Sequence, residues 1–217
     1  DTSYIMQINS AGMEMYKSAI AGYLADTFGA ERIVVKNDGY FRTLEGLPVE
    51  DEILKGDAGT AVVELGGLQY TVDFNAGQKT GLFLDQTENR ILTGRLAAGK
   101  SVLDCFCNTG GFGLHSMQHG ADSVTFVDYS AEMLKQVSAN VQLNNLKTPV
   151  ELLEGDAFKV LKALYENPAK RFDMVIVDPP AFVKSRKKIK EAIKGYLTIN
   201  MSAMKLVNTG GIFATAS

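Results

Sequence analysis

From about residue 84 onward, the sequence alternates regularly between short apolar runs and longer stretches with apolar residues at helical spacing. Such alternation implies a mostly parallel sheet with helices on both faces. The sequence therefore predicts an α/β fold of the Rossmann-like type. Strands are expected at 101–105, 124–128, 150–153, 172–177 and 212–215, and helices at 86–96, 111–119, 131–143, 157–165 and 188–207.

The preceding residues have a different pattern and predict a small α+β module in which nothing looks catalytic. Strands are expected at 4–8 and 33–35, with an amphipathic helix over 13–28 that Gly29 ends. Two further strands, 61–65 and 68–72, flank Gly66-Gly67, which is a strong hairpin signal. We therefore expect two domains, residues 1–75 and 76–217.

Charge, hydropathy and cysteine content limit the setting of the chain. A formal net charge of −3 gives no global attraction to nucleic acid, so any such affinity must be local. No apolar run is long enough to span a membrane. The two cysteines, Cys105 and Cys107, stand too close together for a useful disulfide. A reducing, cytoplasmic location is expected, and the oligomeric state is left open, with a homodimer as one arrangement.

Acidic residues stand at the carboxyl ends of three predicted strands. Asp104 ends the first, Asp128 ends the second, and Asp156 follows the third. In open parallel sheets, ligands bind in the crevice outside these strand ends. A carboxylate at the position of Asp128 can accept both ribose hydroxyls, and one at Asp156 can accept the adenine amino group. The three residues predict a site for an adenosine-containing ligand.

The loop after the first of these strands, Asn108-Thr109-Gly110-Gly111, argues against a dinucleotide. Asn108 stands where the first glycine of the dinucleotide fingerprint would be needed to hold a pyrophosphate. S-adenosylmethionine has no phosphate, and its amino-acid end needs mixed donors and acceptors such as Asn108 and Thr109. Asp104 and Gly110 are assigned to the same pocket, which is typical of class I methyltransferases. An open alternative is that the aspartates only cap the following helices.

A further carboxylate, Asp178, follows the buried strand 172–177 in the sequence Asp178-Pro179-Pro180-Ala181-Phe182. Proline fixes its own φ and forces the preceding residue into an extended conformation, so Asp178 is expected on rigid backbone. Its position at a strand end points it into the ligand crevice. We expect Asp178, Pro179, Pro180 and Phe182 to form the substrate pocket.

Several linked segments resemble the bacterial 23S rRNA cytosine-5 methyltransferases that carry an N-terminal PUA domain. The segments are Gln78-Lys79-Thr80-Gly81-Leu82-Phe83-Leu84-Asp85-Gln86, Asn89-Arg90, residues 104–112, residues 140–145 and residues 178–182. The resemblance implies ribosomal RNA as the partner, and S-adenosylmethionine as cofactor with S-adenosylhomocysteine (SAH) as product. It implies that Asp178 faces the base and that the cofactor is lined by Phe83, Gln86, Asn108, Thr109, Asp128 and Asp156. We add Ser130 and Ala157, which stand beside these carboxylates.

Two departures from the family pattern suggest a fragment of a longer protein. No PUA-like segment precedes Asp1, and the nucleophilic cysteine of the family is expected just after Ser217, together with the last strand pair of the sheet. In the chemistry of the family, a thiolate adds to carbon 6 of cytosine and makes carbon 5 nucleophilic. Carbon 5 takes the methyl group, a base removes its proton, and the thiol leaves. Asp178 can hydrogen-bond the ring as charge develops. The chain alone is expected to be inactive.

Three alternatives to cytosine methylation remain. Exocyclic amino methylation uses an aromatic residue directly after the two prolines, whereas Ala181 stands there and Phe182 comes one position late. Ala181 also takes the place where related RNA cytosine methyltransferases can carry a cysteine. Guanine methylation at a ring nitrogen is the second alternative, and a cofactor-binding module without catalysis is the third.

Two further patterns could bind a ligand: a set of cysteines and histidines that could hold zinc, and a basic segment that could contact RNA. Cys105 and Cys107, with His115 and His119 four apart, resemble zinc ligands. A metal would close the loop that must accept the cofactor, so we expect none, and both histidines are expected on a partly exposed helix face. The basic residues after the proline loop either contact RNA phosphates or form a solvated helix start; they are Lys184, Arg186, Lys187 and Lys188.

Overall fold

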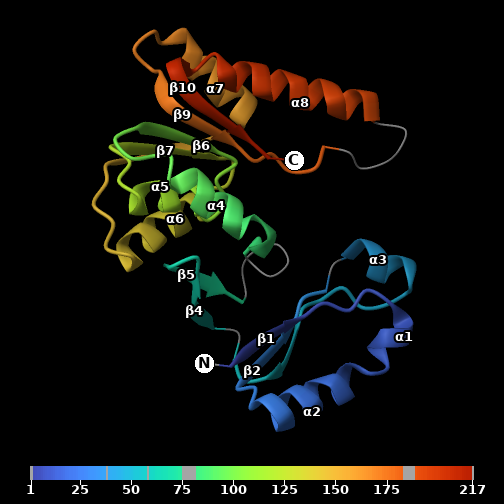
Figure 1. Cartoon of the computed structure of the whole chain (residues 1–217). Coiled ribbons are helices and arrows are strands. Elements are labelled where there is room, and N and C mark those ends of the chain that lie inside the picture. The colour runs from blue at the N-terminus through green and yellow to red at the C-terminus, as the bar shows by residue number, and fades with distance from the viewer. Residues whose placement is uncertain (1, 38, 58, 75–81, 183–188, 217) are drawn as a thin grey trace. The chain divides into compact units, whose positions relative to one another are not determined.

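The computed structural model describes residues 2–37, 39–57, 59–74, 82–182 and 189–216 (Figure 1). The chain forms two compact units. The first contains the residues up to Val63 and Thr71–Leu84, and the second contains Glu64–Tyr70 and the residues from Asp85 onward. The boundary expected between residues 75 and 76 stays a prediction, and the structure groups Glu64–Tyr70 with the second unit.

A three-stranded sheet in the order β1-β2-β3 is the centre of the first unit. Strands β1 (Ser3–Met6) and β2 (Arg32–Val35) are parallel, and β3 (Glu52–Lys55) is antiparallel to β2. Helix α2 (Lys17–Phe28) covers the sheet with one apolar face. The buried residues there are Met6, Ile8, Ala30, Ile33 and Val35, against Ile20, Ala21 and Leu24 of α2.

Local structure in this unit departs from the predicted pattern in two ways. The helix expected over 13–28 is divided into α1 (Ala11–Glu14) and α2, because the chain makes a tight turn in which the amide of Tyr16 donates to the carbonyl of Met13. Gly29 ends α2 in the left-handed conformation, as predicted. Helix α3 (Gly39–Leu44) and strand β3 were not predicted, because both are too short to give a clear periodicity.

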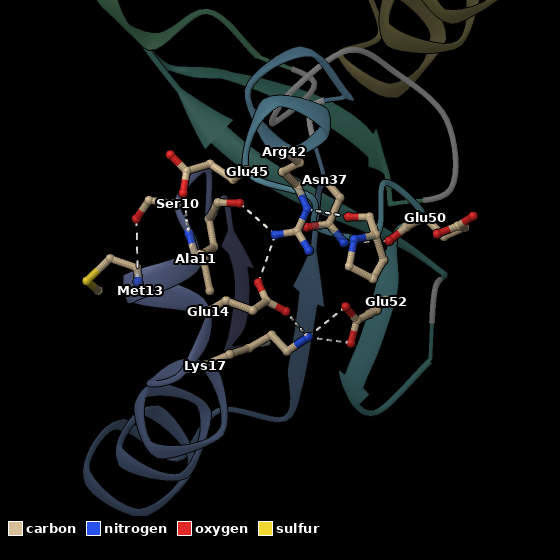
Figure 2. A network of polar contacts seen from close by, with 12 residues as sticks. Ser10, Ala11, Met13, Glu14, Lys17, Asn37, Arg42, Glu45, Glu50 and Glu52 are labelled. Atoms are coloured by element: carbon tan, nitrogen blue, oxygen red, sulfur yellow. Dashed lines mark hydrogen bonds and ion pairs between the residues drawn. The ribbon is translucent and has the colours of Figure 1, made fainter.

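A network of charges inside the first unit surrounds Arg42 of α3 (Figure 2). Arg42 is fully buried, and its Nη1 donates to Glu14 Oε2 at 2.8 Å and to the carbonyl of Ile8 at 2.7 Å. Lys17 Nζ lies 2.7 Å from Glu14 Oε1 and 2.7 Å from Glu52 Oε1. Hydrogen bonds from Arg42 and Lys17 lower the pKa of Glu14 to about 2. The network therefore joins α1, α2, α3 and β3 of this unit.

Strands β4 (Thr60–Leu65) and β5 (Leu68–Asp73) form the predicted hairpin. Gly66 and Gly67 both have positive φ, 63° and 78°, as a tight two-residue turn requires. The tip of the hairpin is tied to helices of the second unit. Asn144 Nδ2 donates to the carbonyl of Gln69 at 2.7 Å, and Asn144 Oδ1 accepts from the amide of Gln69 at 2.8 Å. Gln118 Nε2 donates to the carbonyl of Gly67 at 3.0 Å.

The second unit is built on a five-stranded parallel sheet in the order β10-β9-β6-β7-β8. Chain order reverses at β6, which pairs with β7 on one side and with β9 on the other. Ligands bind at such a topological switch point, outside the carboxyl ends of the strands. The strands are β6 (Ser101–Cys105), β7 (Ser123–Asp128), β8 (Val150–Glu154), β9 (Phe172–Val177) and β10 (Val207–Thr215).

Helices cover both faces of this sheet, as the alternation predicted (Figure 1). Helices α4 (Thr87–Gly94), α5 (Gly111–Gln118) and α6 (Ala131–Leu143) cover one face, and α7 (Ala157–Glu166) and α8 (Ile189–Met204) cover the other. A single 3₁₀ turn, Leu84–Gln86, precedes α4. The α7–α8 side is filled by Leu103, Cys105, Val127, Val175 and Val177 of the strands, with Leu161, Leu164, Ile199 and Ala203 of the helices.

Boundaries near the carboxyl end of the described chain differ from the prediction. Helix α8 ends at Met204 rather than at residue 207, and β10 begins at Val207 rather than at residue 212. An irregularity in the β9–β10 register between Val207 and Ile212 explains the difference, because the first half of the strand lacks regular alternation. Throughout the described residues, no helix combines the length and apolarity that a membrane span needs.

Candidate active site

The carboxyl ends of β6 and β9 lie side by side at the switch point and carry two of the predicted aspartates. The amide of Asp178 donates to the carbonyl of Cys105 at 3.4 Å, which extends the pairing of the two strands. The side chain of Asp104 is buried and faces α5, where Oδ2 accepts from the amide of Gly113 at 2.8 Å. Oδ1 of Asp104 is also buried, and no described residue bonds to it.

The electrostatics of Asp104 follow from this position. Burial raises the pKa of Asp104 to about 7, partly opposed by the Gly113 amide and reinforced by the charge of Asp178. A pKa near neutrality is unusual for a carboxyl group and is typical of functional sites. Asp104 is therefore a candidate for a functional carboxyl group.

The loop between β6 and α5 is held in an uncommon backbone conformation. Phe106, Asn108 and Gly110 all have positive φ, at 61°, 50° and 89°. Glycine adopts this conformation freely and asparagine tolerates it better than most residues, which explains these two residue types. A Cβ on Gly110 would also lie 3.2 Å from Val137, so the loop packs closely against α6. Oδ1 of Asn108 is buried without a hydrogen-bond partner among the described residues.

Asp128 at the end of β7 fixes this loop. Its Oδ2 accepts from the amide of Asn108 at 2.9 Å, and its Oδ1 accepts from the amide of Ser130 at 3.0 Å. The N-cap of α6 is Ser130, whose Oγ accepts from the amide of Met133 at 3.3 Å. The helix-cap alternative therefore does not hold for Asp128. Each carboxylate oxygen keeps a second lone pair for a ligand hydroxyl.

Asp156, by contrast, is the N-cap of α7. Its Oδ1 accepts from the amides of Phe158 at 2.9 Å and Lys159 at 3.3 Å. Ala157, the first residue of the helix, is buried, whereas Asp156 is exposed. The cap alternative holds here, and contact of Asp156 with the cofactor stays a prediction.

The proline segment after β9 places one carboxylate and one aromatic ring. Asp178 is half-buried, and its burial raises its pKa, with a smaller opposing effect from the charge of Arg90. Pro179 is buried and Pro180 is exposed. The ring of Phe182 lies 4.6 Å from that of Tyr196, centroid to centroid, and its amide donates to the Tyr196 hydroxyl at 3.3 Å. A surface pocket of about 210 Å³ is lined by Phe158, Phe182, Glu191, Ala192 and Gly195.

The remaining predicted residues are less informative. Gln86 is half-buried and its Oε1 accepts from Asn89 Nδ2 at 2.8 Å. Phe83 is 41% exposed and belongs to the first unit, so its place at the site stays a prediction. Lys184, Arg186, Lys187 and Lys188 lie outside the described residues, as do residues 78–81 of the resemblance motif.

Comparison with known proteins agrees with this architecture. A family model described as S-adenosylmethionine-dependent methyltransferase matches residues 49–216. The chain belongs to that family. Its fold is the family's Rossmann-like sheet, and its cofactor is S-adenosylmethionine.

Two curated relatives and one solved structure are similar to this methyltransferase chain. Ribosomal RNA large subunit methyltransferase I of Shewanella amazonensis is 38% identical over 98% of this chain and 54% of its own length. A Methanocaldococcus jannaschii protein assigned as a ribosomal RNA large subunit methyltransferase is 42% identical over 94% of this chain and 52% of its length. A Streptococcus mutans protein assigned as a SAM-dependent methyltransferase covers 99% of this chain and 55% of its own, with a TM-score of 0.79 and 23% identity. The chain spans about half the length of the curated relatives it matches.

The polar atoms of this methyltransferase site fit S-adenosylmethionine. Oδ1 of Asp104 and Oδ1 of Asn108 are buried acceptors without partners in the described chain, as the ammonium group of an amino acid requires. Asp128, beside them at the next strand end, offers carboxylate lone pairs suited to ribose hydroxyls. The residues present therefore match a ligand that combines an amino acid with an adenosine.

The cysteines and histidines of the methyltransferase unit do not form the zinc pattern. Cys105 packs in the α7–α8 core, and burial raises the pKa of both cysteines well above the usual value. The expectation of a partly exposed His115 was wrong: a Cβ on Gly66 would lie 2.8 Å from its ring, so the hairpin tip covers it. His119 is half-buried. No group of three or more potential metal ligands occurs among the residues that the structure describes.

Sequence reasoning gave no role to two buried polar residues of the methyltransferase unit. Arg90 of α4 is only 7% exposed, and its charge acts to lower the pKa of both Asp104 and Asp178. In the sequence, only its place in the resemblance segment Asn89-Arg90 marks Arg90. Tyr70 of β5 is fully buried, which the strand alternation predicts, but its hydroxyl lacks a partner in the described chain.

Proposed function

We propose that the protein containing this chain methylates carbon 5 of a cytosine in large-subunit ribosomal RNA. The names of relatives that are 38% identical support the RNA class, and the proline segment supports the base. The observation that carries the proposal is the placement of Asp178, a carboxyl group of raised pKa, at the switch point beside the cofactor strand β6. Since the chain spans about half of these relatives, the proposal concerns the whole protein.

Asp178 has the properties needed to recognise cytosine. A carboxyl group accepts hydrogen bonds in both forms and donates one when protonated, and burial raises the pKa of Asp178, which makes the protonated form easier to reach. Cytosine offers the matching pair, since its ring nitrogen 3 accepts and its exocyclic amino group donates. A proton held at ring nitrogen 3 stabilises the negative charge that develops when a nucleophile adds to carbon 6. Pro179 and Pro180 keep the carboxyl group in place.

The other strand ends orient the cofactor against that base. S-adenosylmethionine supplies an electrophilic methyl group on a positively charged sulfur. In this proposal Asp128 holds the ribose hydroxyls, Asp156 takes the adenine amino group, and Asp104 and Asn108 hold the ammonium group. Thr109 and Gly110, with Phe83, Gln86, Ser130 and Ala157, complete the pocket.

The nucleophile is proposed to be a cysteine outside these 217 residues. Cys105 and Cys107 are buried, and their raised pKa keeps both as thiols at neutral pH, whereas the thiolate is the reactive form. The 217-residue chain alone is therefore proposed to be inactive. Burial and the raised pKa, rather than the cysteine count, support this conclusion.

RNA contacts beyond the base are proposed for the residues after the proline segment. Phe182 lines the surface pocket and is proposed to contact a neighbouring base. Lys184, Arg186, Lys187 and Lys188 are proposed to contact phosphates on the basis of their charge and their place in the sequence. With ribosomal RNA as the substrate, a cytoplasmic location stays part of the proposal, and a homodimer stays open.

The test is methyl transfer to ribosomal RNA by the full-length protein. Labelled S-adenosylmethionine and large-subunit ribosomal RNA are incubated with the enzyme, and the RNA is digested to nucleosides for chromatography and mass spectrometry. We expect 5-methylcytidine. Asp178→Ala should reduce the rate about a hundredfold or more, because a preorganised charge-stabilising contact is lost. Asp122→Ala, an exposed aspartate before β7, is the matched control and should retain full activity.

Other products distinguish the alternatives. Methylated guanosine would identify a guanine methyltransferase and overturn the assignment of Asp178 to cytosine. Absence of any methylated nucleoside, with SAH binding intact, would identify a cofactor-binding module. Formation of 5-methylcytidine by the 217-residue chain alone would overturn the assignment of the nucleophile.

A further inference from the structure

Four buried polar atoms without hydrogen-bond partners in the described chain belong to Arg90, to two residues that interact with it electrostatically, and to the loop against which it packs. They are the hydroxyl oxygen of Tyr70, Nε of Arg90, Oδ1 of Asp104 and Oδ1 of Asn108. Arg90 interacts electrostatically with Tyr70 and Asp104, and Tyr70 interacts with Asp104. The Asn108 amide bonds to Asp128 in the same loop. Buried polar groups are nearly always bonded, so four in one region indicate a site for a polar ligand.

The position of Arg90 is not explained by helix or ion-pair stability. A Cβ on Gly111 would lie 2.5 Å from Arg90 Nε, so the guanidinium lies directly against the N-terminal end of α5. Cζ of the Arg90 guanidinium lies 5.7 Å from the centroid of the Phe112 ring. A helix N-terminus carries partial positive charge, which disfavours a cation there. The charge of Arg90 acts on Asp104 and Asp178, but no ion pair within 4.0 Å joins Arg90 to another described residue, so its guanidinium can still pair with an anionic ligand.

Tyr70 is brought to the same place by the hairpin. Asn144 and Gln118 hold the hairpin tip through the backbone of Gln69 and Gly67. This fixes β5 at the point where the Tyr70 side chain is fully buried. Burial raises the pKa of Tyr70 to about 12, so the hydroxyl keeps its proton and remains a donor. Leaving a buried donor without an acceptor is costly, so an acceptor is expected there.

We propose that Arg90 and Tyr70 bind the carboxylate of the methionine part of the cofactor, and that the hairpin thereby contributes a residue to the methyltransferase site. The two donors, Arg90 and Tyr70, match a carboxylate, and the two acceptors, Asp104 and Asn108, match an ammonium group. A phosphate would meet the two acceptors unfavourably, whereas an α-amino acid satisfies all four atoms. The inference rests on the cofactor-binding part of the proposed function and not on the identity of the base.

Decarboxylated S-adenosylmethionine provides the test, because it keeps the ammonium group and lacks only the carboxylate. Affinities of the 217-residue chain for both compounds are measured by calorimetry. The unmodified chain should bind S-adenosylmethionine more tightly. Arg90→Gln should lower that affinity about 10- to 100-fold, and Tyr70→Phe about 3- to 10-fold, as expected for hydrogen bonds to a charged group. Binding of the decarboxylated compound should be unchanged in both variants.

Matched controls separate this role from a structural one. Arg95→Gln changes an exposed arginine next to α4, and Tyr165→Phe changes a tyrosine near the end of α7; both should leave the two affinities unchanged. Tyr70→Phe removes a single oxygen, so it remains informative if Arg90→Gln fails to fold.

Three results would overturn the inference, in distinguishable ways. Equal weakening of both compounds in the variants would assign Arg90 and Tyr70 to structure alone. Equal affinity of the unmodified chain for both compounds would mean that the carboxylate is not recognised, while the methyltransferase proposal would stand. Absence of binding of either compound to the unmodified chain would overturn the inference together with the proposed cofactor site.

Discussion

Arg42 in the first unit and Arg90 in the second are both buried arginines on short helices, yet their surroundings are opposite. Arg42 contacts Glu14 and the carbonyl of Ile8 directly (Figure 2). Nε of Arg90 has no hydrogen-bond partner in the described chain, and no ion pair within 4.0 Å joins Arg90 to another described residue. The carboxyl groups beside them differ in the same way: the pKa of Glu14 is lowered to about 2, and that of Asp104 is raised to about 7.

The difference between the two arginines indicates that the first serves the stability of the fold and the second serves ligand binding. In the first unit the chain itself supplies nearly every hydrogen-bond and ion-pair partner of the buried charges. These charges are therefore neutralised within the fold and hold its elements together. At the switch point the chain supplies buried donors and acceptors and leaves them open. Strongly perturbed and unsatisfied groups in a crevice are the features of a functional site. The contrast identifies the second group as the one that a ligand completes.

The largest expected effect is on the free energy of unfolding, and it is measured by replacing each of the two arginines. Arg42→Met should lower the free energy of unfolding by about 3–5 kcal/mol, because it breaks a buried ion pair and leaves Glu14 without its partner. Arg90→Met should change it by less than about 1 kcal/mol in the absence of ligand, because no pair is broken and a buried charge is removed. Urea denaturation of the 217-residue chain measures both.

Arg32→Met is a useful third variant, because Arg32 also pairs with a carboxylate, Asp57, which is largely exposed. Its effect should be much smaller than that of Arg42→Met. If Arg90→Met destabilises the ligand-free chain as much as Arg42→Met does, the contrast between the two regions is wrong.

The next effect concerns the pH dependence of binding. Because the pKa of Asp104 is raised to about 7, the ligand-free carboxyl group is mostly protonated below that pH and must lose the proton to accept from an ammonium group. SAH affinity should therefore rise by up to about tenfold per pH unit between pH 5.5 and 7, and then level off. Calorimetry in buffers of different ionisation enthalpy should also detect release of one proton.

Variants in both regions test which group causes SAH affinity to rise with pH. Asp104→Asn should flatten this pH dependence, whereas Asp178→Asn should preserve most of it. Glu14→Gln should have no effect, because the lowered pKa of Glu14 contributes stability above its usual value near 4.5, and this is lost only as pH falls toward 2. A slope that survives Asp104→Asn would assign the titration to another group.

The parts of the molecule that sequence predicted are those set by local patterns. Alternation of apolar segments gives the parallel sheet, and parallel strands bring Asp104, Asp128 and Asp178 to one edge without further information. Gly66-Gly67 gives the hairpin, because two successive positive φ angles require such residues. In each case the signal lies within a few residues of the feature.

The parts that sequence did not predict depend on contacts between distant segments. Gln69 and Asn144, which hold the hairpin tip, are 75 residues apart, and Arg42 and Glu14 are 28 residues apart. Neither pair has a local periodicity that would reveal it. The lack of partners for Arg90 and Tyr70 is harder still to predict, because it depends on everything that surrounds them.

The smallest expected effect concerns Asp156. One of its carboxylate oxygens is satisfied within the fold, and the other is open to a ligand. Its Oδ1 caps α7, like the satisfied charges of the first unit, while no described residue donates to its Oδ2. Asp156→Ala should lower the free energy of unfolding by about 1 kcal/mol, because a helix N-cap is lost. Asp156→Ser should restore stability, because serine caps nearly as well. If the free oxygen takes the adenine amino group, Asp156→Ser should still bind SAH about 3- to 10-fold more weakly. Denaturation and calorimetry on the same samples separate the two roles, and full recovery of both stability and SAH affinity in Asp156→Ser would make Asp156 a helix cap only.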